Sequence, residues 1–211
     1  MMNRFSVVGC LLSVCFLSVA HAEKNATLPT KITSVGSPIF AESFDQSLPE
    51  SAKIAKGQWN VQDGVLVARE IAADNHAAVL SIGSANKDSV VRFSFKLDDN
   101  AEEFHFSLNH KGGHLFRVVV SPSTLAVNLD KDKKDPKSKA MALAKEKGQF
   151  AKGEWHTMQI EIVGDKVAVQ TDNGVSLETS HPRLDTEKPN YRFVMKDATL
   201  CLDDLHVWAV K

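Results

Sequence analysis

The chain has 211 residues, of which 43% are hydrophobic and 24% are charged, and its formal net charge is −1 at pH 7. A chain of this length and composition can bury the core of one globular domain. It carries no basic excess, which argues against nucleic acid or an anionic membrane surface as a partner.

The N-terminus has the three parts of an export signal. Arg4 precedes an apolar run over residues 5–20, and the small residues Ala20 and Ala22 flank a histidine. The run is short for a membrane-spanning helix, which needs about 20 apolar residues. We therefore predict that residues 1–22 are a signal peptide cleaved after Ala22. The mature protein is then secreted or periplasmic, without membrane insertion.

The rest of the chain has the pattern of a β-protein that follows a polar N-terminal tail. The tail is predicted at residues 23–38, which contain two prolines and a glycine, and the domain at residues 39–211. Short runs of alternating apolar and polar residues, separated by turn signals, predict an all-β fold. The predicted strands lie at residues 39–44, on both sides of Asp63-Gly64, and at residues 89–97, 104–110, 114–120, 157–162, 166–171, 191–195 and 200–210. Such a series predicts an antiparallel two-sheet sandwich.

One segment, residues 130–152, breaks this pattern. It is rich in lysine and contains the run SKAMALAKEKG, whose alanine, leucine, methionine, lysine and glutamate residues favour a helix. We predict a short helical or mobile insertion on the surface.

His105, His110 and His114 fall in one stretch, EFHFSLNHKGGHLFRVVV, and raise the question of a metal site. A hairpin with a three-residue loop at 111–113 puts all its apolar pairs on one face and sets His110 opposite His114. His105 then points to the other face, about 17 Å away. Zinc needs three or four ligands, so two histidines are too few. The hairpin predicts polar residues at a rim rather than a metal site.

Polar side chains opposite the predicted core face form a candidate carbohydrate site. Their donors and acceptors suit sugar hydroxyls, and arginine suits a carboxylate. The tentative ligand-binding residues are Arg92, Lys96, His105, Ser107, Asn109, Arg117 and Trp155. Thr157, Gln159 and Glu161 join this face if it continues. The tryptophan serves either as a stacking platform or as a cap on the core. The alternative for the whole set is an ordinary solvent-facing surface.

Acidic residues near the two ends of the domain suggest a structural calcium ion. Glu42 and Asp45 lie in the first predicted strand region and Asp204 in the last, and calcium prefers oxygen ligands. Terminal strands often neighbour one another in sandwiches, so we name these three acids as a tentative calcium site. No other cofactor is predicted. The alternative is that the acids protect strand edges.

Known catalytic motifs are absent from the sequence. HExxH, GxSxG and paired-cysteine metal spacings do not occur, nor does the E-x-D-x-x-E strand of sandwich glycosidases that cut β-glucans. The two carboxylates of a glycosidase can come from separate strands, so the sequence leaves open whether the protein is an enzyme.

Four segments in order resemble concanavalin A-like (laminin G-like) sandwich proteins, and more narrowly exported bacterial 3-keto-disaccharide hydrolase domain proteins. They are F-x-x-S-F-D, GQWNVQDGVLVARE, GEWHTMQIEIVGDKVAVQTDNG and EKPNYRFVMKDATLCLDDLHVW. The resemblance implies a jelly roll whose concave sheet can hold carbohydrate. Three functions stay open: a carbohydrate-binding module, a glycoside hydrolase of the keto-disaccharide type, or a non-catalytic interaction domain of the cell envelope. The oligomeric state also stays open.

Overall fold

The structure is a computed structural model that describes residues 24, 26–98 and 100–211. The predicted signal peptide, residues 1–22, lies outside the described residues. Two 3₁₀ turns, η1 (Ala72–Asp74) and η2 (Pro182–Leu184), are the helical elements of the described chain. Within this part of the protein, no helix has the length and apolar character needed to cross a membrane.

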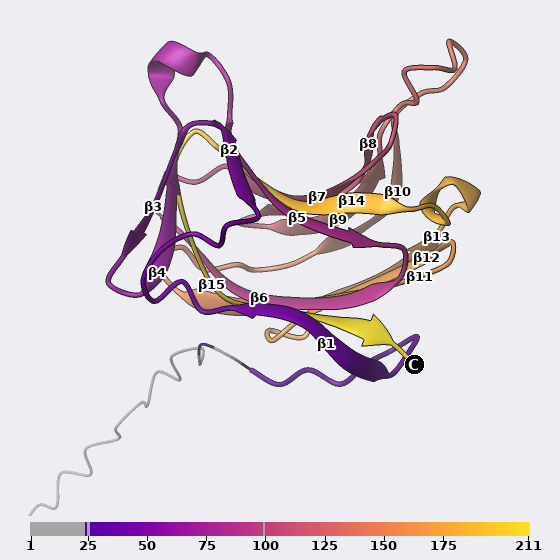
Figure 1. Ribbon diagram of the computed structural model, residues 1–211, viewed down its shortest axis with the longest axis horizontal. Helices are drawn as coiled ribbons and strands as arrows, with labels where there is room; N and C mark the ends of the chain where they lie inside the picture. The colour runs from indigo at the N-terminus through magenta and orange to yellow at the C-terminus, as the bar shows by residue number, and fades with distance from the viewer. Residues whose placement is uncertain (1–23, 25, 99) are drawn as a thin grey trace, which may run out of the picture.

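Two antiparallel sheets pack face to face (Figure 1). The eight-stranded sheet has the order β13 (Ser176–Ser180), β12 (Lys166–Thr171), β11 (Trp155–Val163), β6 (Ser89–Leu97), β15 (Thr199–Val210), β4 (Val65–Arg69) and β3 (Gln58–Gln62), and β1 (Val35–Glu42) pairs with β15. The seven-stranded sheet has the order β10 (Met141–Lys147), β9 (Thr124–Leu129), β8 (Gly113–Ser121), β7 (Glu103–His110), β14 (Lys188–Lys196), β5 (Ala78–Asn86) and β2 (Ala52–Lys56). The predicted all-β, two-sheet antiparallel sandwich is confirmed.

The two sheets curve in the same direction, so their outer surfaces differ in shape. The outer surface of the seven-stranded sheet is concave and that of the eight-stranded sheet is convex (Figure 1). The loop that carries η1 and the loop that precedes β10 rise at opposite ends of the concave surface. Loops raised around a curved sheet are where binding residues commonly gather.

Aromatic side chains join the two sheets in the core. Phe93 from β6 lies with its ring centroid 5.7 Å from that of Phe106 in β7 and 5.3 Å from that of Phe193 in β14. All three are at most 1% exposed. Burial of rings of this size is the main driving force for packing two sheets together. Because successive residues of a strand point to opposite faces, the core residues also fix which side chains face outward.

The helix predicted as one alternative for residues 130–152 is wrong. Residues Met141–Lys147 form β10, which pairs with β9 and places Ala144 opposite Val127 and Lys145 opposite Ala126. Helix propensities differ by only a few tenths of a kcal/mol per residue, so they yield to the backbone hydrogen bonds that a sheet edge offers. The lysines of this strand then discourage another chain from pairing with the new edge.

The predicted boundary between tail and domain, at residue 39, falls inside β1. Ahead of β1, described residues 24 and 26–34, here called the N-terminal segment, lie against the outer surface of the eight-stranded sheet. The backbone carbonyl of Ser34 accepts a hydrogen bond of 3.0 Å from the N–H of Lys211, which ties the segment to the chain's other end.

Candidate functional site

The seven predicted ligand-binding residues do not share a face, because β6 and β7 belong to different sheets. The eight-stranded sheet carries Arg92, Lys96 and Trp155. The seven-stranded sheet carries His105, Ser107, Asn109 and Arg117. Both groups point outward, as the alternation predicts, but from opposite sides of the sandwich. The expected single polar face is therefore wrong, and each surface has to be considered alone.

The N-terminal segment covers the polar centre of the eight-stranded sheet. The carboxylate of Glu161 accepts backbone N–H bonds of 2.8 and 2.9 Å from Lys31 and one of 2.8 Å from Ile32. Nε2 of Gln159 donates to the carbonyl of Pro29 at 3.3 Å. Glu161 and Gln159 are each 1% exposed. Their polar groups are thus satisfied by the protein's own chain.

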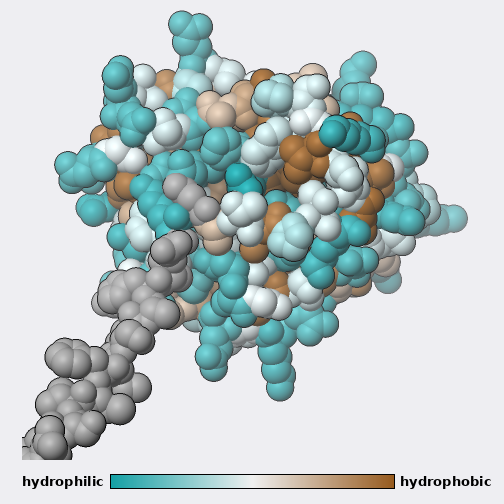
Figure 2. Space-filling view, turned by 90° about the horizontal axis from the view of Figure 1, so that it is seen from below, coloured by the Kyte–Doolittle hydropathy of each residue, from teal (hydrophilic) through white to brown (hydrophobic). Residues whose placement is uncertain are grey.

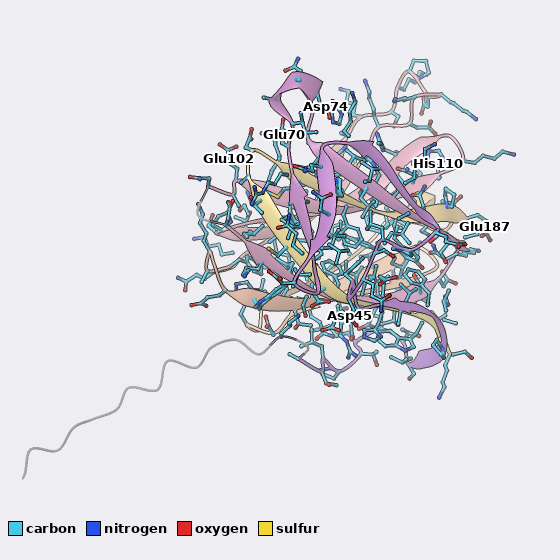
Figure 3. The ribbon with its side chains drawn as sticks, turned by 60° about the vertical axis from the view of Figure 1, so that its left-hand side comes forward. Asp45, Glu70, Asp74, Glu102, His110 and Glu187 are labelled. Atoms are coloured by element: carbon cyan, nitrogen blue, oxygen red, sulfur yellow. The ribbon has the colours of Figure 1, made fainter. Side chains whose placement is uncertain are left out.

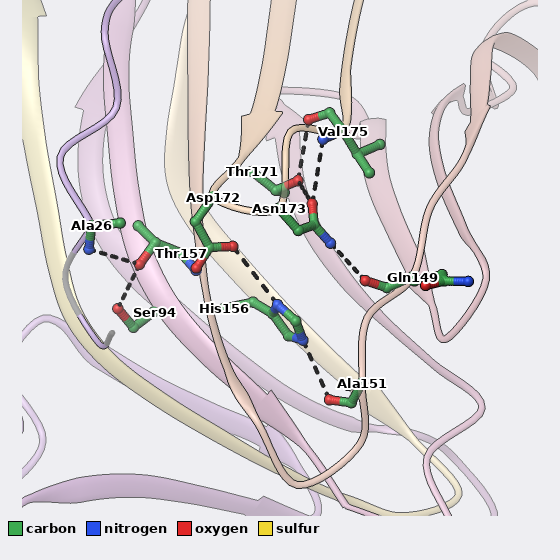
Figure 4. A network of polar contacts seen from close by, with 10 residues as sticks. All are labelled: Ala26, Ser94, Gln149, Ala151, His156, Thr157, Thr171, Asp172, Asn173 and Val175. Carbon is green, nitrogen blue, oxygen red and sulfur yellow. Dashed lines mark hydrogen bonds and ion pairs between the residues drawn. The ribbon is translucent and has the colours of Figure 1, made fainter. Parts of the chain in front are cut away.

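A polar network extends this contact toward the end of the sheet (Figure 4). The N–H of Ala26 donates to Oγ1 of Thr157 at 3.1 Å, and the N–H of Thr157 donates to Oδ2 of Asp172 at 3.0 Å. Oδ1 of Asp172 lies 3.7 Å from Nδ1 of His156, whose Nε2 lies 3.3 Å from the carbonyl of Ala151. The network connects the N-terminal segment to the loop before β11.

The aromatic residues of this surface are also engaged. The ammonium groups of Lys24 and Lys96 each lie 5.1 Å from the ring of Trp155, and Lys24 also pairs with Asp203. The guanidinium of Arg92 lies 5.0 Å from the ring centroid of Trp208, which belongs to the same sheet. Figure 2 looks onto this side, where hydrophilic side chains stand around a rim and the centre is mixed white and brown. These contacts leave the predicted stacking platform occupied by cations of the chain.

On the concave surface, polar side chains form a row across four neighbouring strands. Arg192 in β14 is opposite Ser107 in β7, Ser107 is opposite Arg117 in β8, and Arg117 is opposite Asn128 in β9. We call these four residues the polar row. Adjacent strands lie about 4.8 Å apart, so the two arginines start from positions about 10 Å apart with the serine between them.

One arginine of the row is held by a carboxylate. Nε of Arg117 donates to Oδ2 of Asp130 at 3.2 Å, and its terminal nitrogen contacts Oδ1, so the pair is bidentate. The backbone carbonyl of Asp130 accepts a bond of 2.8 Å from Arg183, and its N–H donates to Leu115 at 2.8 Å. Asp130 is therefore fixed from both sides, and it fixes Arg117 in turn.

Beside this pair lies a histidine that is neutral at pH 7. Nε2 of His105 is 3.3 Å from a carboxylate oxygen of Glu103, and the His105 side chain is 12% exposed. Burial lowers the pKa of His105, although the Glu103 carboxylate acts in the opposite direction, and the Arg117 charge lowers it further. Because a carboxylate can only accept, the neutral ring carries its proton on Nε2 and its lone pair on Nδ1.

His105, Arg117 and Asp130 meet in a hollow of about 450 Å³, one wall of which comes from residues 140–142 at the start of β10. The segment expected to be a helical or mobile insertion thus builds part of the candidate site. A larger hollow of about 670 Å³ lies elsewhere, between Ser123 and Asn173, but its lining contains no carboxylate or imidazole. The smaller hollow is therefore the better candidate for recognition or chemistry.

The hairpin of β7 and β8 follows the predicted register up to Leu108, which is opposite Phe116. Asn109 is then opposite His114, so Leu115 is an extra residue in a β-bulge. The predicted pairing of His110 with His114 is therefore wrong. His110 instead accepts a bond of 3.3 Å from Gly112 within the turn, at the rim of the molecule (Figure 3).

The bulge turns His114 toward the concave surface, where sequence reasoning did not expect it. Its Nδ1 lies 3.0 Å from Oδ1 of Asn109 and 3.3 Å from the guanidinium of Arg192. Arg192 was also missed as a site residue. Its position between Tyr191 and Phe193, both buried, was a signal that it faces outward. A one-residue bulge leaves no comparable signal in the sequence.

Two of the three acids of the predicted calcium site, Glu42 and Asp45, make local hydrogen bonds. Glu42 accepts a bond of 2.9 Å from the N–H of Phe44, and Asp45 accepts one of 2.7 Å from Ser43. Burial raises the pKa of Asp204, as do the neighbouring acids. Throughout the described residues, no group of three His, Cys, Asp or Glu side chains is placed to hold a metal ion. Calcium binding stays a prediction from the sequence.

The two-sheet antiparallel sandwich with one concave outer surface agrees with the concanavalin A-like fold that the sequence resemblance implied. Residues 42–206 match the model of the family described as the 3-keto-alpha-glucoside-1,2-lyase-like domain. The chain belongs to this family. A search of curated proteins gives no match.

Several solved structures share the fold at low sequence identity. The chain is similar to the carbohydrate-binding module CBM66 from Bacillus subtilis, with 11% identity and a TM-score of 0.62 over 75% of this chain and 96% of that one. The chain is also similar to a non-specific endo-β-1,3(4)-glucanase of family GH16, with 12% identity and a TM-score of 0.62 over 92% of this chain and 98% of that one. A third similar structure is a putative glycosyl hydrolase from Parabacteroides distasonis, with 12% identity and a TM-score of 0.53 over 81% of this chain and 99% of that one. At such identities these likenesses establish the fold.

Proposed function

We propose that the protein binds a carbohydrate on the concave surface of the seven-stranded sheet, and that 3-keto glucosides are the ligand class. The observation that carries the proposal is the meeting of His105, Arg117 and Asp130 in one hollow of about 450 Å³. Fixed donors and acceptors in a concave site suit a ring with several hydroxyl groups. The family description and the carbohydrate-binding neighbour support the ligand class.

The histidine favours a second, catalytic function, the elimination that the family description names. A keto group at C3 of a glucoside makes the proton on C2 acidic. Nδ1 of His105 would take this proton, and the C–H electrons would form the C1–C2 double bond. The C1–O bond would then break, and the leaving oxygen would take a proton from solvent. Arg117 would stabilise the negative charge that develops on the keto oxygen.

The test uses a p-nitrophenyl 3-keto-α-glucoside, whose cleavage releases a coloured phenol. We expect Arg117→Gln to weaken binding and His105→Gln to abolish release while binding persists. His76→Gln, at an exposed histidine on the η1 loop, is the matched control. The mass of the earliest sugar product separates the two reactions, because elimination gives an unsaturated sugar one water lighter than the 3-keto glucose that hydrolysis gives.

Two results would separate the remaining possibilities. Binding without release would make the protein a carbohydrate-binding module. Absence of both would refute 3-keto glucosides as the ligand class and favour an interaction role in the envelope. We also propose export, which follows from the predicted signal; mass spectrometry of the mature protein should give Glu23 as its first residue.

A further inference from the structure

We infer that the polar row selects an acidic carbohydrate, whose carboxylate binds to the guanidinium of Arg192 and the hydroxyl of Ser107. This inference rests on the proposed function, because it names a subsite of the same concave surface. It goes further in specifying a negative charge on the sugar, which neither a keto group nor a hydroxyl supplies.

The first observation is a half-buried positive charge without a carboxylate partner. Burial lowers the pKa of Arg192 and the charge of Arg117 lowers it further, while the Asp130 carboxylate acts in the opposite direction. The one carboxylate nearby, Asp130, is already held in a bidentate pair by Arg117. Among the ion pairs of the described residues, none includes Arg192.

The contact that Arg192 does make supplies no negative charge. Its guanidinium lies 3.3 Å from Nδ1 of His114. Burial lowers the pKa of His114, and the charge of Arg192 lowers it further, so the imidazole is neutral at pH 7. A desolvated charge whose hydrogen-bond partner is neutral, and whose nearest carboxylate is bound by another arginine, is costly unless an opposite charge arrives. An anionic ligand would supply that charge.

The second observation is an unsatisfied hydroxyl beside this arginine. Ser107 is 4% exposed, and its Oγ has no hydrogen-bond partner among the described atoms. Buried hydroxyl groups nearly always have a partner, and a serine can donate to a carboxylate oxygen. Because Ser107 is directly opposite both Arg192 and Arg117, a carboxylate that accepts from it is held within reach of two cations.

Arg92 on the eight-stranded sheet is a half-buried arginine whose partners can be compared with those of Arg192. It too is half-buried in the middle of a strand, and burial lowers its pKa. However, the Asp204 carboxylate acts to raise that pKa, and the ring of Trp208 lies 5.0 Å from the guanidinium. Arg92 therefore has both an opposite charge and a stacking partner from its own sheet. Arg192 feels only the Asp130 carboxylate, which Arg117 already binds, and among the described residues no ring is recorded over its guanidinium, which singles it out for a ligand.

The test compares two sugars that differ only at C6, methyl α-glucoside and methyl α-glucuronide, by titration calorimetry at low ionic strength. We expect the glucuronide to bind about tenfold to a hundredfold more tightly, the gain of one or two hydrogen bonds to a charged group. Arg192→Gln and Ser107→Ala should each reduce this preference, and Arg192→Lys should retain part of it. Arg92→Gln, the matched control, should leave it unchanged.

Each outcome decides the inference. Equal affinities for the two sugars would overturn it and leave the proposed carbohydrate site intact. A preference that survives Arg192→Gln would place the carboxylate elsewhere and also overturn it. Binding of neither sugar would overturn the inference, and the assay with the 3-keto glucoside then decides the proposed function separately. Circular dichroism of each variant shows whether it folds, and Ser107→Ala, which removes one oxygen atom, provides the answer if Arg192→Gln does not.

Discussion

Replacing Glu161 with alanine is expected to weaken the attachment of the N-terminal segment to the eight-stranded sheet. The carboxylate accepts backbone N–H bonds from Lys31 and Ile32, at 2.8 to 2.9 Å, from a position that is 1% exposed. A hydrogen bond to a charged group contributes about 1.5–3 kcal/mol. Two such bonds set an upper limit of about 6 kcal/mol. Because the variant no longer buries a charge, we expect a net loss of about 2–3 kcal/mol in the free energy of unfolding.

The loss should be visible as a fall in the melting temperature. For a domain of this size, 1 kcal/mol shifts Tm by about 2–4 °C, so Glu161→Ala should melt about 5–10 °C lower than the wild type. Glu178→Ala, which removes an exposed glutamate from β13 of the same sheet, is the control and should leave Tm nearly unchanged. Calorimetry on the mature protein measures both.

A shortened chain that begins at Val35 provides the decisive comparison. Without the N-terminal segment, the carboxylate of Glu161 loses its backbone partners, and alanine at this position should cost nothing or even stabilise the protein. If Glu161→Ala destabilises the shortened chain as much as the full one, the carboxylate acts within the sheet. The reasoning about the segment would then be refuted.

Three further results are expected. Burial lowers the pKa of His105 and of His114 below the usual 6.5, so both contribute stability that is complete above pH 6.5 and is lost as the pH falls through their lowered values. Urea unfolding at about pH 7.5 and pH 5 measures this, and a flat profile would contradict it. Asp130→Asn removes the counter-charge of Arg117 and should reduce stability by about 1–3 kcal/mol in the same assay; an unchanged midpoint would mean that the pair is fully screened. If the predicted calcium site exists, Tm should be higher in the presence of calcium than in the presence of a chelator. Asp204→Asn should abolish this difference.

How far the sequence predicts the fold is clear from β6 and β7. The alternation along each strand correctly separates the core side, with Phe93 and Phe106, from the outer side, with Arg92 and His105. Alternation is a local property, whereas sheet membership depends on partners far along the chain. β6 pairs with β11 and β15, and β7 with β8 and β14. The pattern therefore predicts faces but not which strands share a sheet, and the candidate site was spread over both.

The misassigned parts near the concave site have local causes. β10 contains residues that favour a helix, but backbone hydrogen bonds to β9 at the edge of the sheet stabilise it as a strand. At the hairpin, the extra residue Leu115 shifts the register by one, which exchanges the faces of the residues beside the turn. Both deviations help to build the site, since β10 supplies a wall and the bulge presents His114. Periodic sequence patterns predict regular strands. The candidate site depends on two features that such patterns do not predict, the bulge at Leu115 and the strand β10.

The two outer surfaces carry similar polar patterns, but the N-terminal segment covers only the convex one. The segment has no strand periodicity because its backbone, rather than its side chains, makes most of the contacts, so its own sequence gives little sign of docking. The sign lies in the sheet. Glu161 stands in a central strand opposite Ala168 and Val90, neither of which can pair with a carboxylate. Within its own strand Glu161 accepts a bond of 3.2 Å from Nε2 of Gln159, and its remaining acceptor positions require donors from elsewhere in the chain or from a ligand. On the convex surface the chain supplies the partner, whereas among the described residues no carboxylate forms an ion pair with Arg192 on the concave surface.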